Sequence, residues 1–117
     1  MNERKKERKM ERITKVRQLE NKNQFIMEDD EKTIFQSYDS IIAVFDKEKR
    51  DLTLGCDWDY SRTTLKHLYI FLRDVIYYDL KLEQKTRIQE ALESTNTKKA
   101  IQKLIDKNVI QYESELI

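Results

Sequence analysis

The sequence predicts an α+β fold, in which a small antiparallel β-sheet packs against a long central helix and two shorter C-terminal helices. Three observations support this. β-branched and aromatic residues gather between positions 33 and 54, and apolar residues between 61 and 80 recur at helical spacing. The first 22 residues are mostly helix formers without Gly or Pro. A length of 117 residues suits one compact domain.

The N-terminal segment, residues 1–22, is expected to form a protruding basic helix. It holds nine Lys or Arg and four Glu, whereas the remaining residues hold fourteen Lys or Arg and eighteen Asp or Glu. The net charge of +1 therefore hides a dipolar chain. A narrow stripe of Met10, Ile13, Val16 and Leu19 indicates docking on the body or pairing in a homodimer. Residues 23–32 are expected to be an acidic connector, and residues 33–117 the α+β domain.

The β signature begins at Thr33. Residues 40–45 and 51–54 predict the two strands of a hairpin, joined by a charged turn. Gly55 follows directly and is expected to adopt a positive φ. A lone hairpin is only marginally stable in water, so residues 109–112 are a candidate third strand.

Residues 61–80 are expected to form the main helix, with Ser61 as its N-cap. Its core face holds Leu65, Leu68, Tyr69, Leu72, Val75, Ile76 and Leu80. Two shorter helices are expected over residues 82–94 and from Thr97, the latter followed by Asn108 in the C′ position.

Composition narrows the functional classes. No apolar run approaches the roughly 20 residues that span a bilayer, and no secretory signal is evident, so no membrane association is expected. A single cysteine, Cys56, indicates a reducing, cytoplasmic location. With one Gly and no Pro, the chain cannot form the glycine-rich turns that bind phosphates or expose a nucleophile. We therefore expect neither an enzyme nor a cofactor.

One cluster invites a metal interpretation: Cys56, Asp57, Asp59 and His67 lie within twelve residues. Zinc usually takes four nitrogen or sulfur ligands in paired spacings, which this cluster lacks. A structural role explains the cluster better: the acidic residues stabilise the start of a helix beside a buried Trp58. His67 is expected on the polar side of that helix.

Binding residues are expected on three surfaces. The basic arm offers Arg4, Lys5, Lys6, Arg8, Lys9, Arg12, Lys15 and Arg17 to nucleic-acid phosphates or to an acidic protein surface. An aromatic set of Ile70, Phe71, Tyr77 and Tyr78 lies off the core face of the main helix; it is either an interface or part of the core. Glu28, Asp29, Asp30 and Glu31, with Asp39, Asp46, Asp57 and Asp59, either mimic phosphates or serve solubility.

The central third of the chain contains two notable strings. Residues 37–43 read Ser-Tyr-Asp-Ser-Ile-Ile-Ala, and residues 58–64 read Trp-Asp-Tyr-Ser-Arg-Thr-Thr, followed by Leu65, Leu68, Phe71 and Leu72. These strings resemble small proteins from phages and mobile elements of low-GC Gram-positive bacteria, whose pattern is SY-x-[ST]-IIA followed by WDYS-x-TT. We expect Trp58 and Tyr60 to pack beneath the hairpin, which makes the motif a folding element first.

The resemblance implies a context. Small charged phage proteins commonly act by binding a host macromolecule, and anti-CRISPR proteins are one such class. The resemblance thus implies an inhibitor of a host defence system, with a type II CRISPR effector nuclease or its guide-RNA complex as the expected partner. The alternative is a phage DNA-binding transcriptional regulator that uses the basic arm, although no helix-turn-helix is evident.

Overall fold

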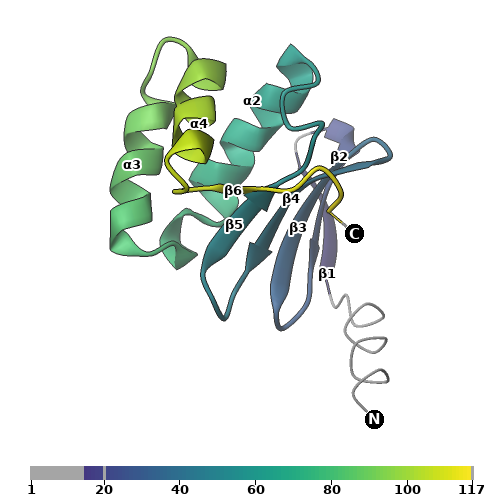
Figure 1. Ribbon diagram of the computed structural model, residues 1–117. Helices are drawn as coiled ribbons and strands as arrows, with labels where there is room; N and C mark the ends of the chain where they lie inside the picture. Colours follow the sequence, from purple (N-terminus) through teal and green to yellow (C-terminus); the bar gives the residue numbers. More distant parts are fainter. Residues whose placement is uncertain (1–14, 20, 117) are drawn as a thin grey trace.

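The computed structural model describes residues 15–19 and 21–116. Over these residues the fold is α+β: one six-stranded sheet carries its helices on one face (Figure 1). The strands lie side by side in the order of the chain, β1-β2-β3-β4-β5-β6. Each pair is antiparallel except the last, β5 and β6, which is parallel.

The strands have the following bounds: β1 (Lys15–Leu19), β2 (Asn21–Glu28), β3 (Lys32–Ser37), β4 (Ser40–Asp46), β5 (Asp51–Leu54) and β6 (Gln111–Tyr112). The predicted hairpin is confirmed as β4 and β5 with their charged turn. The predicted C-terminal strand is confirmed as β6, which closes the sheet edge beside β5. The sheet is therefore larger than the expected hairpin plus one strand.

The expected helix over residues 1–22 is wrong for 15–19, which form strand β1, and residues 1–14 lie outside the described part. The expected connector is largely strand β2. In β1, Val16 pairs with Met27 of β2, and Arg17 pairs with Ile26. Pairing along a neighbouring strand overrides the weak helix preference of a short segment. In β2, burial alternates along the strand: Gln24 and Ile26 are buried, whereas Phe25 and Met27 are half-buried. The hydrophobicity of these residues does not alternate, so the sequence gives no strand signal there.

The two faces of the sheet differ. The helix-covered face contributes Ile26, Phe35, Ala43 and Leu54, which follow one another across four paired strands and belong to the core. The opposite face carries a second row, Val16, Met27, Ile34 and Val44, which lies outside that core cluster. Alternation between the faces is the period-two pattern of a sheet with one covered side.

The helical layer consists of α2 (Arg62–Ile70), the π-helical turn η1 (Phe71–Val75), the 3₁₀ turn η2 (Tyr77–Asp79), α3 (Leu82–Leu92) and α4 (Thr97–Asp106). Figure 1 shows α3 and α4 side by side and antiparallel, packed with α2 over the sheet. None of the described helices is long and apolar enough to cross a membrane.

The expected main helix is divided into three segments. Its start is as predicted, since the Ser61 Oγ accepts the Thr64 backbone N–H at 3.1 Å. After Ile70 the helix widens, and the Ile76 N–H donates to the Phe71 carbonyl at 3.2 Å, five residues back. This change of pitch rotates every later side chain away from its ideal helical position. The predicted core face is nevertheless confirmed beyond Ile70, since Leu72, Ile76 and Leu80 are buried, and Phe71 is buried in addition.

Other local predictions have mixed outcomes. Asn108 has a φ of 59° after α4, as its predicted C′ position requires, whereas Asn96 rather than Thr97 caps that helix. Gly55 does not have a positive φ, so that prediction is wrong. Glycine is needed there for space, because a Cβ would lie 2.9 Å from the Leu116 Cδ1 and 3.0 Å from the Ile41 carbonyl oxygen.

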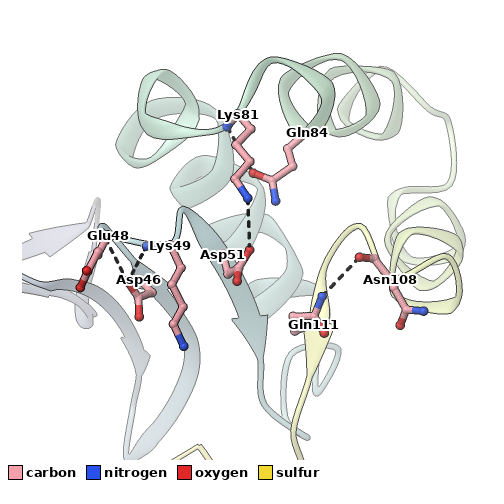
Figure 2. A network of polar contacts seen from close by, with 8 residues as sticks. All are labelled: Asp46, Glu48, Lys49, Asp51, Lys81, Gln84, Asn108 and Gln111. Atoms are coloured by element: carbon pink, nitrogen blue, oxygen red, sulfur yellow. Dashed lines mark hydrogen bonds and ion pairs between the residues drawn. The ribbon is translucent and has the colours of Figure 1, made fainter.

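Polar contacts connect the hairpin to the helical layer (Figure 2). In the β4–β5 turn, the Asp46 Oδ1 accepts the backbone N–H groups of Glu48 and Lys49, both at 3.0 Å. The Lys81 Nζ reaches Asp51 of β5 at 4.0 Å, while its backbone N–H donates to the Gln84 side chain. A separate bond from the Gln111 side chain to the Asn108 carbonyl, at 3.3 Å, fixes the entry into β6.

Candidate binding surfaces

The basic arm is described only at its end. Lys15 and Arg17 lie in β1, are exposed and, two residues apart, share one side of the strand. Arg4, Lys5, Lys6, Arg8, Lys9 and Arg12 lie outside the described residues. Homodimer pairing through a helical stripe is excluded for Val16 and Leu19, because both belong to a strand.

The acidic cluster forms a structured turn between β2 and β3. Asp29 is only 8% exposed, and its Oδ1 accepts the backbone N–H groups of Glu31 and Lys32, both at 2.7 Å. Lys47 binds the Glu28 carboxylate at 2.7 Å and the Asp29 carbonyl oxygen at 2.7 Å. The prediction that Asp29 contacts a partner is wrong, because its carboxylate is buried in the turn. Asp30 is the exposed member.

The aromatic set is divided between core and surface. Phe71 is fully buried and stacks on Phe35 with ring centroids 5.6 Å apart, so its prediction as a partner contact is wrong. Ile70 and Tyr77 are half-buried, and the Tyr77 hydroxyl donates to Gln89 at 2.9 Å. Tyr78 is 82% exposed and meets the Tyr77 ring edge to face. The π-helical turn explains why Phe71 and Tyr78, seven residues apart, do not share a face.

A groove in two parts runs along α2; its first part is basic, whereas its second part has the carboxylates of Asp74 and Glu93 beside the single basic residue Arg73. Its first part, about 710 Å³, lies between α2 and residues 95–98 and is lined by four basic residues (Arg62, Lys66, Arg73 and Lys98) as well as by Tyr69 and Ile70. Its second part, about 490 Å³, shares Tyr69 and Arg73 and continues past Tyr77 and Tyr78 to α3. We call both parts together the α2 groove.

One basic residue of the α2 groove, Arg73, contacts an aromatic ring, and Lys85, which lies outside the groove's lining, contacts two more. The Arg73 guanidinium lies 5.4 Å from the Tyr69 ring centroid, and the Lys85 Nζ lies 5.8 and 5.9 Å from the rings of Tyr77 and Tyr78. Arg73 also donates two hydrogen bonds to the neighbouring Asp74 carboxylate, both at 2.7 Å. These bonds lower the pKa of Asp74, with the guanidinium charge adding to the effect, and raise the pKa of Arg73. Charged guanidinium beside tyrosine is suited to phosphates and nucleobases.

A second cavity, of about 520 Å³, lies where the β3–β4 turn meets the start of α2. We call it the turn cavity. Its lining consists of Ser37, Tyr38, Asp39, Ser40, Ile42, Asp57, Tyr60, Ser61, Thr63 and Thr64. The Ser40 hydroxyl donates to the Asp57 carboxylate at 2.9 Å, which joins the strand to the loop before α2.

Polar side chains beside the turn cavity are buried without partners. Ser37 is 3% exposed, and its hydroxyl has no hydrogen-bond partner among the described residues. The same holds for both amide atoms of Gln24, which is 0% exposed and pairs with Ser37 across β2 and β3. An unsatisfied buried polar group costs on the order of 1–3 kcal/mol. In folded proteins, buried polar groups without a protein partner are commonly satisfied by an ordered water or a bound ligand.

The Cys56 cluster has a different geometry from the one expected. His67 is buried, not on a polar face, and its Nδ1 lies 2.8 Å from the Thr63 carbonyl oxygen. Cys56 is exposed, with its sulfur 3.8 Å from Asp57. Within residues 15–19 and 21–116, no three His, Cys, Asp or Glu side chains gather in a manner that would hold a metal ion.

Sequence reasoning missed the turn cavity as a site. Its lining comes from residues 37–42 and 57–64, which nearly coincide with the two strings singled out in the sequence. Trp58 is buried as expected, but Tyr60 is 80% exposed, so its expected packing beneath the hairpin is wrong. The available signal was the presence of two strings rich in Ser, Thr, Tyr and Asp. The sequence alone does not show that the fold brings these two strings together.

Comparison with known proteins gives one match. A model for a family of unknown function, DUF8033, matches residues 8–91. The chain belongs to DUF8033. No curated protein and no solved structure matches the chain. The whole turn cavity lies within the DUF8033 match, whereas α4 and β6 lie beyond it, and with them the side of the α2 groove formed by residues 95–98.

Proposed function

We propose that this protein acts by binding and blocking a nucleoprotein, without turnover. The observation that carries the proposal is the α2 groove, in which Arg62, Lys66, Arg73 and Lys98 surround Tyr69. Basic side chains bind phosphates, and an aromatic ring stacks on an unpaired base. The groove is thus suited to single-stranded RNA or DNA displayed on a protein complex.

Protein contacts in this proposal come from the neighbouring surface. Tyr78 is almost fully exposed beside Lys85, and exposed tyrosines are frequent at the centres of protein interfaces. Lys15 and Arg17, together with the basic residues that precede β1, add positive charge that attracts RNA or an acidic protein patch. Ile70 forms part of the α2 groove beside Tyr69.

The specific partner that we propose is a type II CRISPR effector nuclease or its guide-RNA complex in the bacterial host cytoplasm. The support is the resemblance to small phage proteins, combined with a groove suited to RNA phosphates and bases. In this proposal the protein is a phage-encoded anti-CRISPR inhibitor that prevents DNA binding or cleavage.

The test uses the full chain and a purified type II effector with and without guide RNA. We expect stoichiometric binding to the guide-RNA complex and loss of DNA cleavage. Arg62→Glu with Lys98→Glu should weaken binding at least tenfold, because two phosphate contacts are lost. Lys49→Glu with Arg50→Glu is the matched control: it makes the same change of charge at exposed positions of the β4–β5 turn.

Two results would contradict the proposal. Failure to bind the effector in either state would refute the CRISPR partner. Equal binding by the groove variant and the control variant would refute the role of the α2 groove. Preferential binding to one duplex DNA sequence at about 0.15 M salt would instead support the DNA-binding regulator. The antiparallel packing of α3 and α4 differs from the crossed helices of a helix-turn-helix (Figure 1).

A further inference from the structure

The turn cavity has the opposite charge to the α2 groove. Its lining includes two carboxylates, Asp39 and Asp57, and five hydroxyl-bearing Ser or Thr side chains, with no Lys or Arg among the ten lining residues. One oxygen of Asp57 accepts from the Ser40 hydroxyl at 2.9 Å and the other from the Cys56 thiol at 3.8 Å, and each oxygen has a second lone pair that can accept from a ligand. The cavity therefore favours a cation that donates hydrogen bonds and disfavours phosphate.

Buried polar groups beside the turn cavity point to a ligand. Ser37 is one of the residues that line the cavity, and its hydroxyl is shielded from solvent and has no partner in the described residues. The Gln24 amide, at the paired position of β2, likewise has neither its donor nor its acceptor satisfied there. A ligand with several N–H donors satisfies the Ser37 oxygen and the carboxylates at once.

Two tyrosines stand at the same cavity. Tyr60 and Tyr38 both line it and both expose most of their surface. Tyr38 has a φ of 52°, a backbone conformation that side chains other than Gly, Asn or Asp seldom adopt. Its N–H donates to the Asn23 carbonyl at 2.7 Å, and its own carbonyl accepts the Gln36 side chain at 2.7 Å. The turn thus holds Tyr38 in a costly conformation at the cavity.

We propose that the turn cavity binds a guanidinium group, the side chain of an arginine presented by a partner protein. A guanidinium is planar, stacks on tyrosine and carries five N–H donors in a fixed fork that suits carboxylates and hydroxyl oxygens. A lysine ammonium offers three donors and no plane to stack. This site lies at the β3–β4 turn and stands whether or not the α2 groove binds nucleic acid.

The first experiment measures binding of a blocked arginine, N-acetyl-arginine amide, to the ¹⁵N-labelled full chain by NMR. We expect saturable shifts at the amides of residues 37–40 and 57–64. The uncharged isostere, N-acetyl-citrulline amide, should bind at least about tenfold more weakly, since it lacks the charge that pairs with the carboxylates. Free L-arginine should bind no more tightly than the blocked form, as expected for a side chain within a protein.

Two variants on exposed positions separate binding from folding. Asp39→Asn and Tyr60→Ser should each lower the affinity for the arginine probe by about fivefold, which is the effect expected for the loss of one exposed charge pair or cation–π contact. Both should leave the thermal midpoint unchanged. Asp106→Asn on α4 and Tyr78→Ser on η2 are the matched controls and should leave the affinity for the probe unchanged.

Ser37→Ala gives a further readout that a purely structural hydroxyl would not produce. Because this substitution removes a buried polar group that has no partner, it should raise the thermal midpoint of unfolding while lowering the affinity for the arginine probe. Ser40→Ala, which loses the bond to Asp57, should lower the midpoint. The proposal is overturned if citrulline or inorganic phosphate binds the cavity as well as the arginine probe, if free L-arginine binds much more tightly, or if Asp39→Asn and Tyr60→Ser leave the affinity unchanged.

Discussion

The strand layer and the helical layer of this protein have opposite charges. Residues 21–61, which contain β2 to β5 and the loop before α2, hold five Lys or Arg and ten Asp or Glu, a net charge of −5. Residues 62–107, which contain all the helices of the described part, hold ten Lys or Arg and six Asp or Glu, a net charge of +4. The sequence predicted a basic arm on a mildly acidic body. The fold shows that this body is itself divided into two layers.

This difference shows why net charge is a poor guide to partners. Over residues 21–117 as a whole, the opposite net charges of the two layers largely cancel, so the net charge of the protein reveals neither surface. Resolved by layer, the protein has a basic, tyrosine-containing groove along α2 and an acidic, tyrosine-containing cavity at the β3–β4 turn. In our two proposals, each surface binds a ligand of the opposite charge, and one small domain has two different recognition sites.

The largest expected effect contrasts two aromatic residues of the helical layer. Phe71→Ala should destabilise the fold by about 3–5 kcal/mol, because it removes a fully buried ring stacked on Phe35. Tyr78→Ala should cost less than about 0.5 kcal/mol, because its ring is exposed. Urea denaturation followed by tryptophan fluorescence of Trp58 measures both. Equal losses for the two variants would show that the π-helical turn does not separate them.

A smaller effect is expected where Leu116 packs against Gly55, the residue that follows β5. Gly55→Ala should cost about 1–3 kcal/mol, the usual penalty of overpacking, because the new Cβ meets Leu116 and the Ile41 carbonyl. Combining it with Leu116→Ala should recover part of that loss relative to Leu116→Ala alone. No recovery in the double variant, measured by the same denaturation, would rule out crowding by Leu116 as the cause.

Much of the fold was predictable because its signals are local. The Ser61 cap, the β4–β5 hairpin and the Asn108 terminus each depend on a few neighbouring residues, and the structure confirms all three. Strand β1 was not predictable in this way. Its five residues have a helix-like composition, and the pairing with β2, the next strand along the chain, makes them a strand in spite of that composition.

The candidate sites were less predictable than the fold. Phe71 and Asp29 looked like surface residues, but one is buried by a change of helix pitch and the other by its own turn hydrogen bonds. The turn cavity needs residues some 20 positions apart in the chain to meet, as Ser40 and Asp57 do. The periodicity of residues along one helix or strand does not predict a contact between two separate segments of the chain.

The smallest expected effect concerns the Arg73–Asp74 pair at the α2 groove. Its two hydrogen bonds lower the pKa of Asp74 below the ordinary value of 3.8. A carboxyl group with a lowered folded-state pKa stabilises the protein above its unfolded pKa, and this contribution is lost as the pH falls through the folded pKa. Because the pair is exposed, the loss should be only a few tenths of a kcal/mol. Carbon-13 NMR should show Asp74 titrating below 3.8, and Arg73→Gln should return it to that value; a normal pKa in the unmodified protein would refute the pairing in solution.

The division into two oppositely charged layers is tested most directly with a short single-stranded RNA. The measurement is the affinity at several salt concentrations for the full chain, for Arg62→Glu with Lys98→Glu, and for Lys49→Glu with Arg50→Glu. We predict that the first variant binds at least tenfold more weakly, with a log–log salt slope shallower by about 1.4, as expected for two lost phosphate contacts. The second variant, on the strand layer, should retain the affinity and slope of the unmodified protein; equal losses in the two variants would contradict a polyanion site on the helical layer.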